Sequence, residues 1–138
     1  MKYPYLFTCL LVLLLAGCNR GMHTVSGRVL YDDKAVDKGT IAFIAEEGRG
    51  SAYGGDISSG KYKVHVPNGD YLVMIHGEKK VRLDKPIEIV GLPPKYETTE
   101  ELIPECYNMY STLKYTVDQK SVTQDFILEK ADFSSEAN

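Results

Sequence analysis

The stretch KYKVHVPNGDYLVMI, residues 61–75, decides the fold class of this chain. Apolar residues occupy every second position on both sides of its centre, and this period predicts two half-buried β-strands. The centre, Pro67-Asn68-Gly69-Asp70, combines residue types that form tight turns between antiparallel strands. The segment therefore predicts a β-hairpin in which Val66 pairs with Tyr71.

Further strands are expected on both sides of this segment. No apolar period of 3.6 residues persists over ten residues, whereas short alternating runs recur at the spacing of an all-β protein. Residues 91–104 contain three prolines and are expected to form a long loop. The other expected strands lie at residues 24–31, 40–45, 51–57, 86–90, 113–117 and 122–128.

These strands predict one all-β domain, an antiparallel Ig-like or transthyretin-like β-sandwich of about seven strands. A chain of 138 residues is long enough for one such domain. The domain is expected to span residues 24–128, and residues 129–138 form a polar C-terminal tail.

The N-terminus has the layout of an export signal. Residues 6–15 form an apolar run that is shorter than the roughly 20 residues of a membrane-spanning helix. The run follows Lys2 and ends in Leu15-Ala16-Gly17-Cys18, which resembles a bacterial lipobox, an aliphatic residue and two small residues before cysteine. The resemblance implies a signal peptide at residues 1–17, a lipid-modified Cys18 and a spacer over residues 18–23.

The lipobox also implies a location. A protein acylated on Cys18 is anchored to the membrane of the bacterial cell envelope, and its domain lies in water. Cys18 is followed by Asn19 rather than by the aspartate that favours retention in the inner membrane, so the outer membrane is expected.

Several short motifs, in this order, resemble the carboxypeptidase regulatory-like domains, which have a transthyretin-like (prealbumin-type) fold. The resemblance extends to small bacterial lipoproteins with one such domain and covers residues 24–128. It implies an accessory module at the cell surface and no catalytic residue. Cys106 departs from the expected polar residue. The motifs are VSGRV at residues 25–29, GTIAFI at 39–44, and Gly-x-Tyr at 60–62 and 69–71.

The residues also argue against several kinds of chemistry. A pI near 5.6 disfavours a nucleic-acid partner. In the expected hairpin His65 and His76 lie about 13 Å apart, too far to share a metal ion. Cys106 is the one cysteine of the mature domain besides Cys18, and it is expected to be a buried or semi-exposed structural residue. No nucleophile, phosphate-binding or zinc motif is present, so the sequence predicts no metal, no cofactor and no enzymatic activity.

Two functions remain open at this point. The first is an envelope module that acts through protein contacts or as a structural element. The second is a carbohydrate- or peptidoglycan-binding module, in which Tyr96, Tyr107 and Tyr110 form an aromatic surface for a glycan. The expected partners are therefore the membrane, through the lipid on Cys18, and an envelope protein or a glycan.

Overall fold

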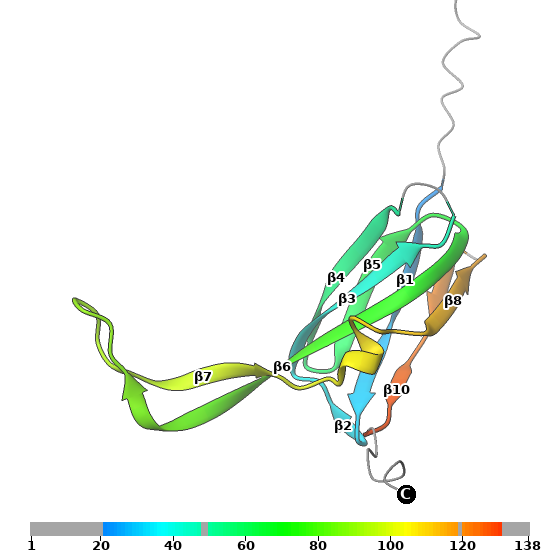
Figure 1. Cartoon of the computed structure of the whole chain (residues 1–138). Helices are drawn as coiled ribbons and strands as arrows, with labels where there is room; N and C mark the ends of the chain where they lie inside the picture. The colour runs from blue at the N-terminus through cyan, green and yellow to red at the C-terminus, as the bar shows by residue number, and fades with distance from the viewer. Residues whose placement is uncertain (1–20, 48–49, 119, 131–138) are drawn as a thin grey trace, which may run out of the picture.

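The chain folds into an almost entirely β-stranded body from which one long arm projects (Figure 1). The computed structural model describes residues 21–47, 50–118 and 120–130. A single short 3-10 helix, Glu105–Tyr107, interrupts the strands of this part of the chain. The strands are β1 (His23–Tyr31), β2 (Lys34–Ala35), β3 (Lys38–Ala45), β4 (Ala52–Ser58), β5 (Lys61–Val66), β6 (Gly69–Ile87), β7 (Lys95–Glu101), β8 (Leu113–Val117), β9 (Ser121–Thr123) and β10 (Phe126–Leu128).

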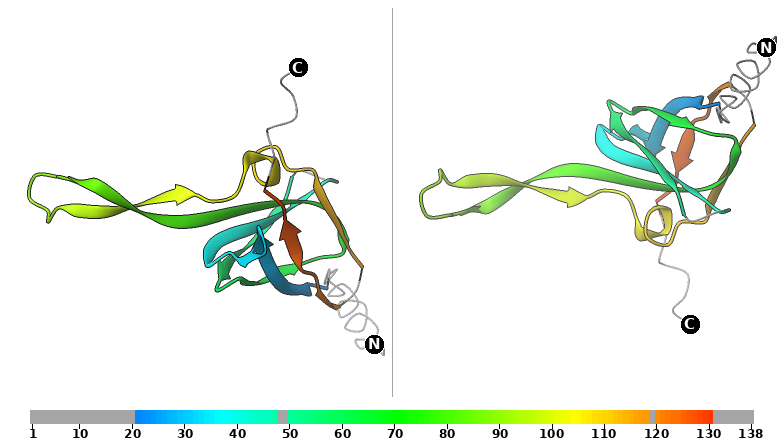
Figure 2. Two further views of the ribbon diagram at one scale, coloured as in Figure 1. Left: turned by 90° about the horizontal axis from the view of Figure 1, so that it is seen from below. Right: turned by 90° about the horizontal axis from the view of Figure 1, so that it is seen from above.

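The strands form one curled sheet with the order β10-β1-β5-β4-β3-β6-β7. The short strands β2 and β9 pair with β1, and β8 pairs with β6. Most neighbours are antiparallel, but β9 and β10 run parallel to β1. β4 and β5 pair only beside their turn, at Ile57↔Tyr62 and Ser58↔Lys61, and this narrow link lets the sheet curl on itself. Figure 2 shows the curled body from both ends.

The core lies inside the curl, and its centre is an aromatic cluster. The ring of Phe43 on β3 lies 6.0 Å from that of Tyr71 on β6 and 6.5 Å from that of Tyr62 on β5. Tyr115 on β8 and Phe126 on β10 pack against the same ring at 6.3 and 6.4 Å. Aromatic pairs at these distances add to the free energy gained from burial, so the cluster holds together strands from both ends of the sheet.

The expected hairpin over residues 61–75 is wrong. β5 pairs with β1 and β4, whereas β6 pairs with β3, β7 and β8. The Tyr71 hydroxyl donates a hydrogen bond of 2.8 Å to the carbonyl oxygen of Pro67, four residues earlier, and fixes a corner instead of a hairpin turn. Tyr71 is also buried in the core, so the same side chain that supports the strand prediction turns the chain away from β5.

Three other sequence-based boundaries also require correction. Residues 95–101 form strand β7 rather than part of a long loop, because the second half of β6 offers them an edge for pairing. Pro86 and Ile87 end β6 instead of beginning a separate strand. The expected strand 122–128 divides at Gln124 and Asp125 into β9 and β10, which leaves Phe126 and Leu128 buried together.

Removing the hydroxyl of Tyr71 tests the corner. We expect Tyr71→Phe to lower the free energy of unfolding by about 1 kcal/mol, because the Pro67 carbonyl loses its donor while the ring stays in place. Chemical denaturation followed by circular dichroism measures the change. Tyr110→Phe is the control, since Tyr110 is mostly exposed, and it is expected to leave the stability unchanged. Equal stability of the two variants would contradict a role for the corner.

Candidate functional site

The arm, residues 78–101, is the feature that most distinguishes this chain from a simple all-β body. β3 pairs with β6 as far as Lys38↔Glu78, and beyond Glu78 strand β6 pairs with β7 alone. Nine further residues of β6, at about 3.3 Å each, carry its end about 30 Å from this point. Figures 1 and 2 show the resulting two-stranded ribbon extending away from the body.

The two faces of the arm differ in character. Val81 lies opposite Thr98 on one face, and both are half-buried. Arg82 lies opposite Glu97 on the other face. An ion pair of 3.3 Å between Lys79 Nζ and Glu100 Oε2 joins the strands near the base. A lone two-stranded ribbon is marginally stable in water, so these cross-strand contacts and the attachment to the body both matter.

Glu101 fixes the base of the arm to the body. One carboxylate oxygen accepts hydrogen bonds from the N–H groups of Gly77, at 2.8 Å, and Ile103, at 3.0 Å. The other oxygen lies 2.9 Å from Nδ1 of His76. Burial alone would raise the pKa of Glu101, but these hydrogen bonds outweigh it and hold the pKa below its ordinary value. The carboxylate therefore stabilises the junction only in its charged form.

Gly77 completes this junction by leaving room for the core. A Cβ atom at residue 77 would lie 2.8 Å from Cγ1 of Ile103 and 3.1 Å from Cγ1 of Val36. Both neighbours are buried. The strand thus passes from the body into the arm at a point where a larger side chain does not fit.

The far end of the arm is an exposed apolar tip, residues 89–94. Val90 is fully exposed, and more than half of the surface of Ile89 and of Leu92 is accessible. The tip turns at Ile89, whose carbonyl accepts a 3.0 Å hydrogen bond from the N–H of Leu92. Concentrated apolar surface of this kind marks an interaction site in a protein that is otherwise folded around its own core.

The three tyrosines that were expected to form a glycan surface do not lie together. Tyr96 is near the outer end of β7, on the arm. Tyr107 packs against the core of the body, and its hydroxyl accepts a hydrogen bond from the N–H of Glu129. Tyr110 is exposed beside the short helix. The rings therefore do not provide one continuous stacking platform.

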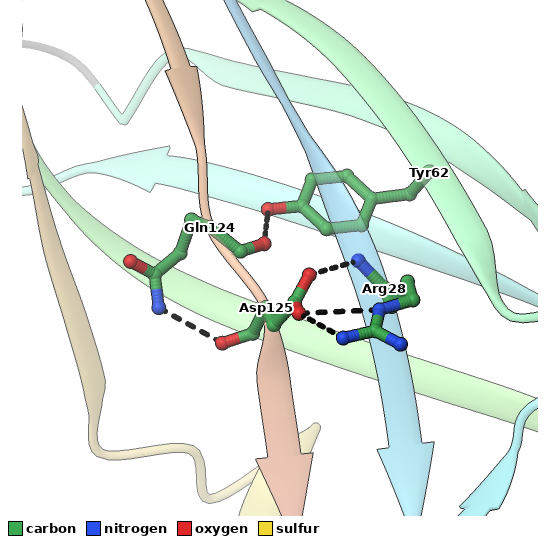
Figure 3. Close-up of polar contacts among 4 residues, drawn as sticks. All are labelled: Arg28, Tyr62, Gln124 and Asp125. Carbon is green, nitrogen blue, oxygen red and sulfur yellow. Dashed lines mark hydrogen bonds and ion pairs between the residues drawn. The ribbon is translucent and has the colours of Figure 1, made fainter.

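A polar cluster on the body joins β1 to the segment between β9 and β10 (Figure 3). Oδ1 of Asp125 accepts from the backbone N–H of Arg28, and Oδ2 accepts from its Nε and Nη2, at 2.8, 3.2 and 2.8 Å respectively. The hydrogen bond and charge of Arg28 lower the pKa of Asp125. The Tyr62 hydroxyl donates to the carbonyl of Gln124 at 2.7 Å, and burial raises its pKa. These groups form hydrogen bonds with one another, so the cluster links the segment between the parallel strands β9 and β10 to β1 and β5.

Gly27 on β1 allows the backbone of Gln124 to approach β1 closely. A Cβ atom at residue 27 would lie 1.9 Å from the carbonyl oxygen of Gln124, so only glycine permits the close approach of the two backbones. A shallow depression beside the cluster is lined by Ser26, Gly27, Arg28, Lys61, Tyr62, Thr123 and Asp125.

The remaining predicted site residues lie elsewhere. Cys106 is a free cysteine and is exposed, whereas a buried or semi-exposed side chain was expected. His65 Nδ1 lies 3.1 Å from the Thr24 hydroxyl, and His76 is engaged with Glu101. Within residues 21–47, 50–118 and 120–130, no group of three His, Cys, Asp or Glu side chains is arranged to hold a metal ion. The lipobox residues, Leu15, Ala16, Gly17 and Cys18, lie outside the described residues, which include no helix with the length and apolar character to cross a membrane.

Comparison with known proteins gives little support for a family. No family model matches the chain, and no curated protein matches it. One solved structure, a 9R-lipoxygenase from Cyanothece PCC8801, matches 83% of this chain at 10% identity with a TM-score of 0.36. The matched part is 18% of the length of that protein. The resemblance to carboxypeptidase regulatory-like domains therefore stays a prediction.

The prediction that this protein is not an enzyme has to be corrected. The solved chain that it matches is a lipoxygenase, which is an enzyme, so the absence of enzymatic activity is no longer assigned to this chain. A likeness with a TM-score of 0.36 carries no argument about activity, so lipoxygenase activity is not assigned to this chain either.

The hydrogen bonds at the base of the arm predict a pH-dependent stability. Because the pKa of Glu101 is lowered, its contribution is complete above the ordinary carboxyl pKa of about 4.3 and is lost as the pH falls through the lowered value. We expect Glu101→Gln to lower the free energy of unfolding at pH 7 by at most about 1 kcal/mol, since the group is half-exposed to solvent.

Thermal unfolding at pH 7 and at pH 3 measures this effect. The difference between the wild type and Glu101→Gln should shrink at pH 3, because below the ordinary carboxyl pKa the stability gained from the lowered pKa of Glu101 is progressively lost. Glu100→Gln is the matched control, because Glu100 makes only the exposed ion pair with Lys79. A difference that is the same at both pH values would contradict the role given to the charge of Glu101.

Proposed function

We propose that this protein is a lipid-anchored docking protein of the bacterial cell envelope, in which a β-sandwich body carries the projecting arm. The observation that carries the proposal is the exposed apolar tip, which lies at the end of a ribbon about 30 Å from the edge of the body. A surface that the chain does not cover with its own side chains favours contact with something outside it.

The N-terminal sequence supports the anchoring part of the proposal. Leu15-Ala16-Gly17-Cys18 follows an apolar run of signal-peptide length. An acyl chain on Cys18 contributes about 0.8 kcal/mol for each CH2 group that enters the membrane, and several chains together hold the protein stably. Asn19 favours the outer membrane as the location.

The fold contributes to the sandwich part of the proposal. β4 and β5 pair only next to their turn, so the curl can bring two groups of strands face to face across the Phe43 cluster. A tyrosine whose hydroxyl bonds back to the backbone a few residues earlier is typical of β-sandwiches with strands that cross between sheets. A transthyretin-like body accords with these features.

Substituting two cysteines separately tests the anchor. In a bacterial host we expect the mature wild-type chain to begin at an acylated Cys18, as shown by mass spectrometry, and to sediment with membranes. Cys18→Ser should carry no acyl chain, because the sulfur that receives the lipid is missing. The amount of this variant that sediments with membranes should be at least tenfold lower than for the wild type.

Cys106→Ser is the control for this experiment. Its side chain is exposed on the body, so the variant should be acylated and retained like the wild type. A wild-type chain whose mature N-terminus carries no lipid would contradict the proposed function.

A further inference from the structure

Exposed apolar side chains are concentrated on the arm. Within the described residues nine large apolar side chains are exposed, and five of them lie between Ile87 and Tyr96. They are Ile87, Ile89, Val90, Leu92 and Tyr96. This concentration distinguishes the arm from the rest of the described chain, where the exposed large apolar side chains are Met22, Met109, Tyr110 and Ile127.

The tip is also poor in polar groups. No side chain from Ile89 to Pro94 carries a charge or a hydrogen-bonding group. Pro93 and Pro94 have no backbone N–H, and the N–H of Leu92 already donates to Ile89. An unsatisfied backbone group is costly in hydrocarbon, so this loop can leave water at a lower cost than an ordinary loop.

The residues on either side of the tip fit the polar boundary of a membrane. Lys85 and Lys95 can extend their ammonium groups towards lipid phosphates, and Tyr96 has the amphipathic ring that is enriched at this depth. Glu88 and Lys95 are charged and bound the apolar segment on both sides. Insertion would therefore stop at these two residues and take up only the turn between them.

The chemistry of the tip favours lipid over a protein cleft. Binding energy in protein interfaces is concentrated in tryptophan, tyrosine and arginine that fill shaped pockets. The tip beyond Glu88 instead presents Ile89, Val90 and Leu92, which point outward from a narrow turn. Such aliphatic side chains on a convex loop do not need a shaped pocket, and fluid lipid acyl chains can surround them without one.

We infer that the tip of the arm inserts into the surface of a lipid bilayer and gives the protein a second membrane contact beside the lipid on Cys18. The inference rests on the proposed function, because the acylated cysteine holds the body at the membrane and so keeps the tip at a high effective concentration there. Two separate points of attachment would fix the orientation of the body relative to the membrane.

An environment-sensitive dye at the tip tests the inference in the full, acylated protein. In a Cys106→Ser background, Val90→Cys and Thr99→Cys each provide one free thiol for the dye, since the sulfur of Cys18 carries the lipid. Thr99 is exposed on β7 of the same arm and serves as the matched control. Vesicles of zwitterionic phosphatidylcholine suit a protein of net negative charge.

We expect the dye at residue 90 to shift to shorter wavelength and to be quenched by a quencher on the lipid acyl chains. The dye at residue 99 should report water. Adding Ile89→Asp to the Val90→Cys protein should return the emission to its value in water, because a carboxylate opposes insertion. Adding Lys80→Asp, a change on the exposed face of the arm, should leave the shift in place.

Other outcomes would overturn the inference in recognisable ways. If the protein is acylated by mass but the dye at residue 90 reports water, the inference fails and the lipid anchor stands. If the shift appears without vesicles and increases with protein concentration, the tip binds a second copy of the chain and not lipid. If the mature protein carries no lipid, the proposed function and the inference fail together.

Discussion

The packing of aromatic rings around Phe43 is the constraint on which the rest of the structure depends. The ring lies on β3, near the middle of the sheet, and contacts rings from β5, β6, β8 and β10. A sheet whose two ends share one cluster has to curl, because a flat sheet would place these rings far apart. The curl buries one face of β6 from Tyr71 to Gly77 and so determines where the body ends.

The arm begins where this burial stops. Alternate residues of β6 are buried as far as Gly77, and beyond this point the strand continues with exposed or half-buried side chains. Its partner changes at the same place from β3 to β7. Two residues stabilise this junction. Glu101 accepts hydrogen bonds from the backbone N–H groups of Gly77 and Ile103, and Gly77 leaves space for the side chain of Ile103. Strand β6 thus runs through both the body and the arm, with one face buried in the body and little buried in the arm.

The sequence was sufficient to predict most of the longer strands of the body, because alternation of apolar residues records which face of each strand is buried. Tyr62 and Tyr71 are buried in these strands, and their hydroxyls donate hydrogen bonds to backbone carbonyls. The partners of the strands were harder to predict. Asn68-Gly69 favours a hairpin locally, whereas in the folded chain β6 pairs with β3 and β8, and the hydrogen bond from Tyr71 to Pro67 stabilises the corner that leads to them.

The arm was not predicted from the sequence, for a related reason. Its strands bury little, so residues 79–85 and 95–101 lack a clear apolar period, and two of the three prolines that suggested a long loop occupy only the turn of the arm. The β-branched pair Thr98-Thr99 was the local signal that was available. Tyr96 lies apart from Tyr107 and Tyr110, although the three are close in sequence, because β7 carries Tyr96 out along the arm.

The open edges of the arm have a consequence for the way in which copies of the protein meet. An unpaired strand edge is a template for another chain, and crowding favours such contacts. The β6 edge carries Lys79, Lys80 and Arg82, while the β7 edge carries Glu97 and Glu100. Two like edges therefore repel each other, so the charges that hold the ribbon together also oppose the merging of neighbouring arms through identical strands.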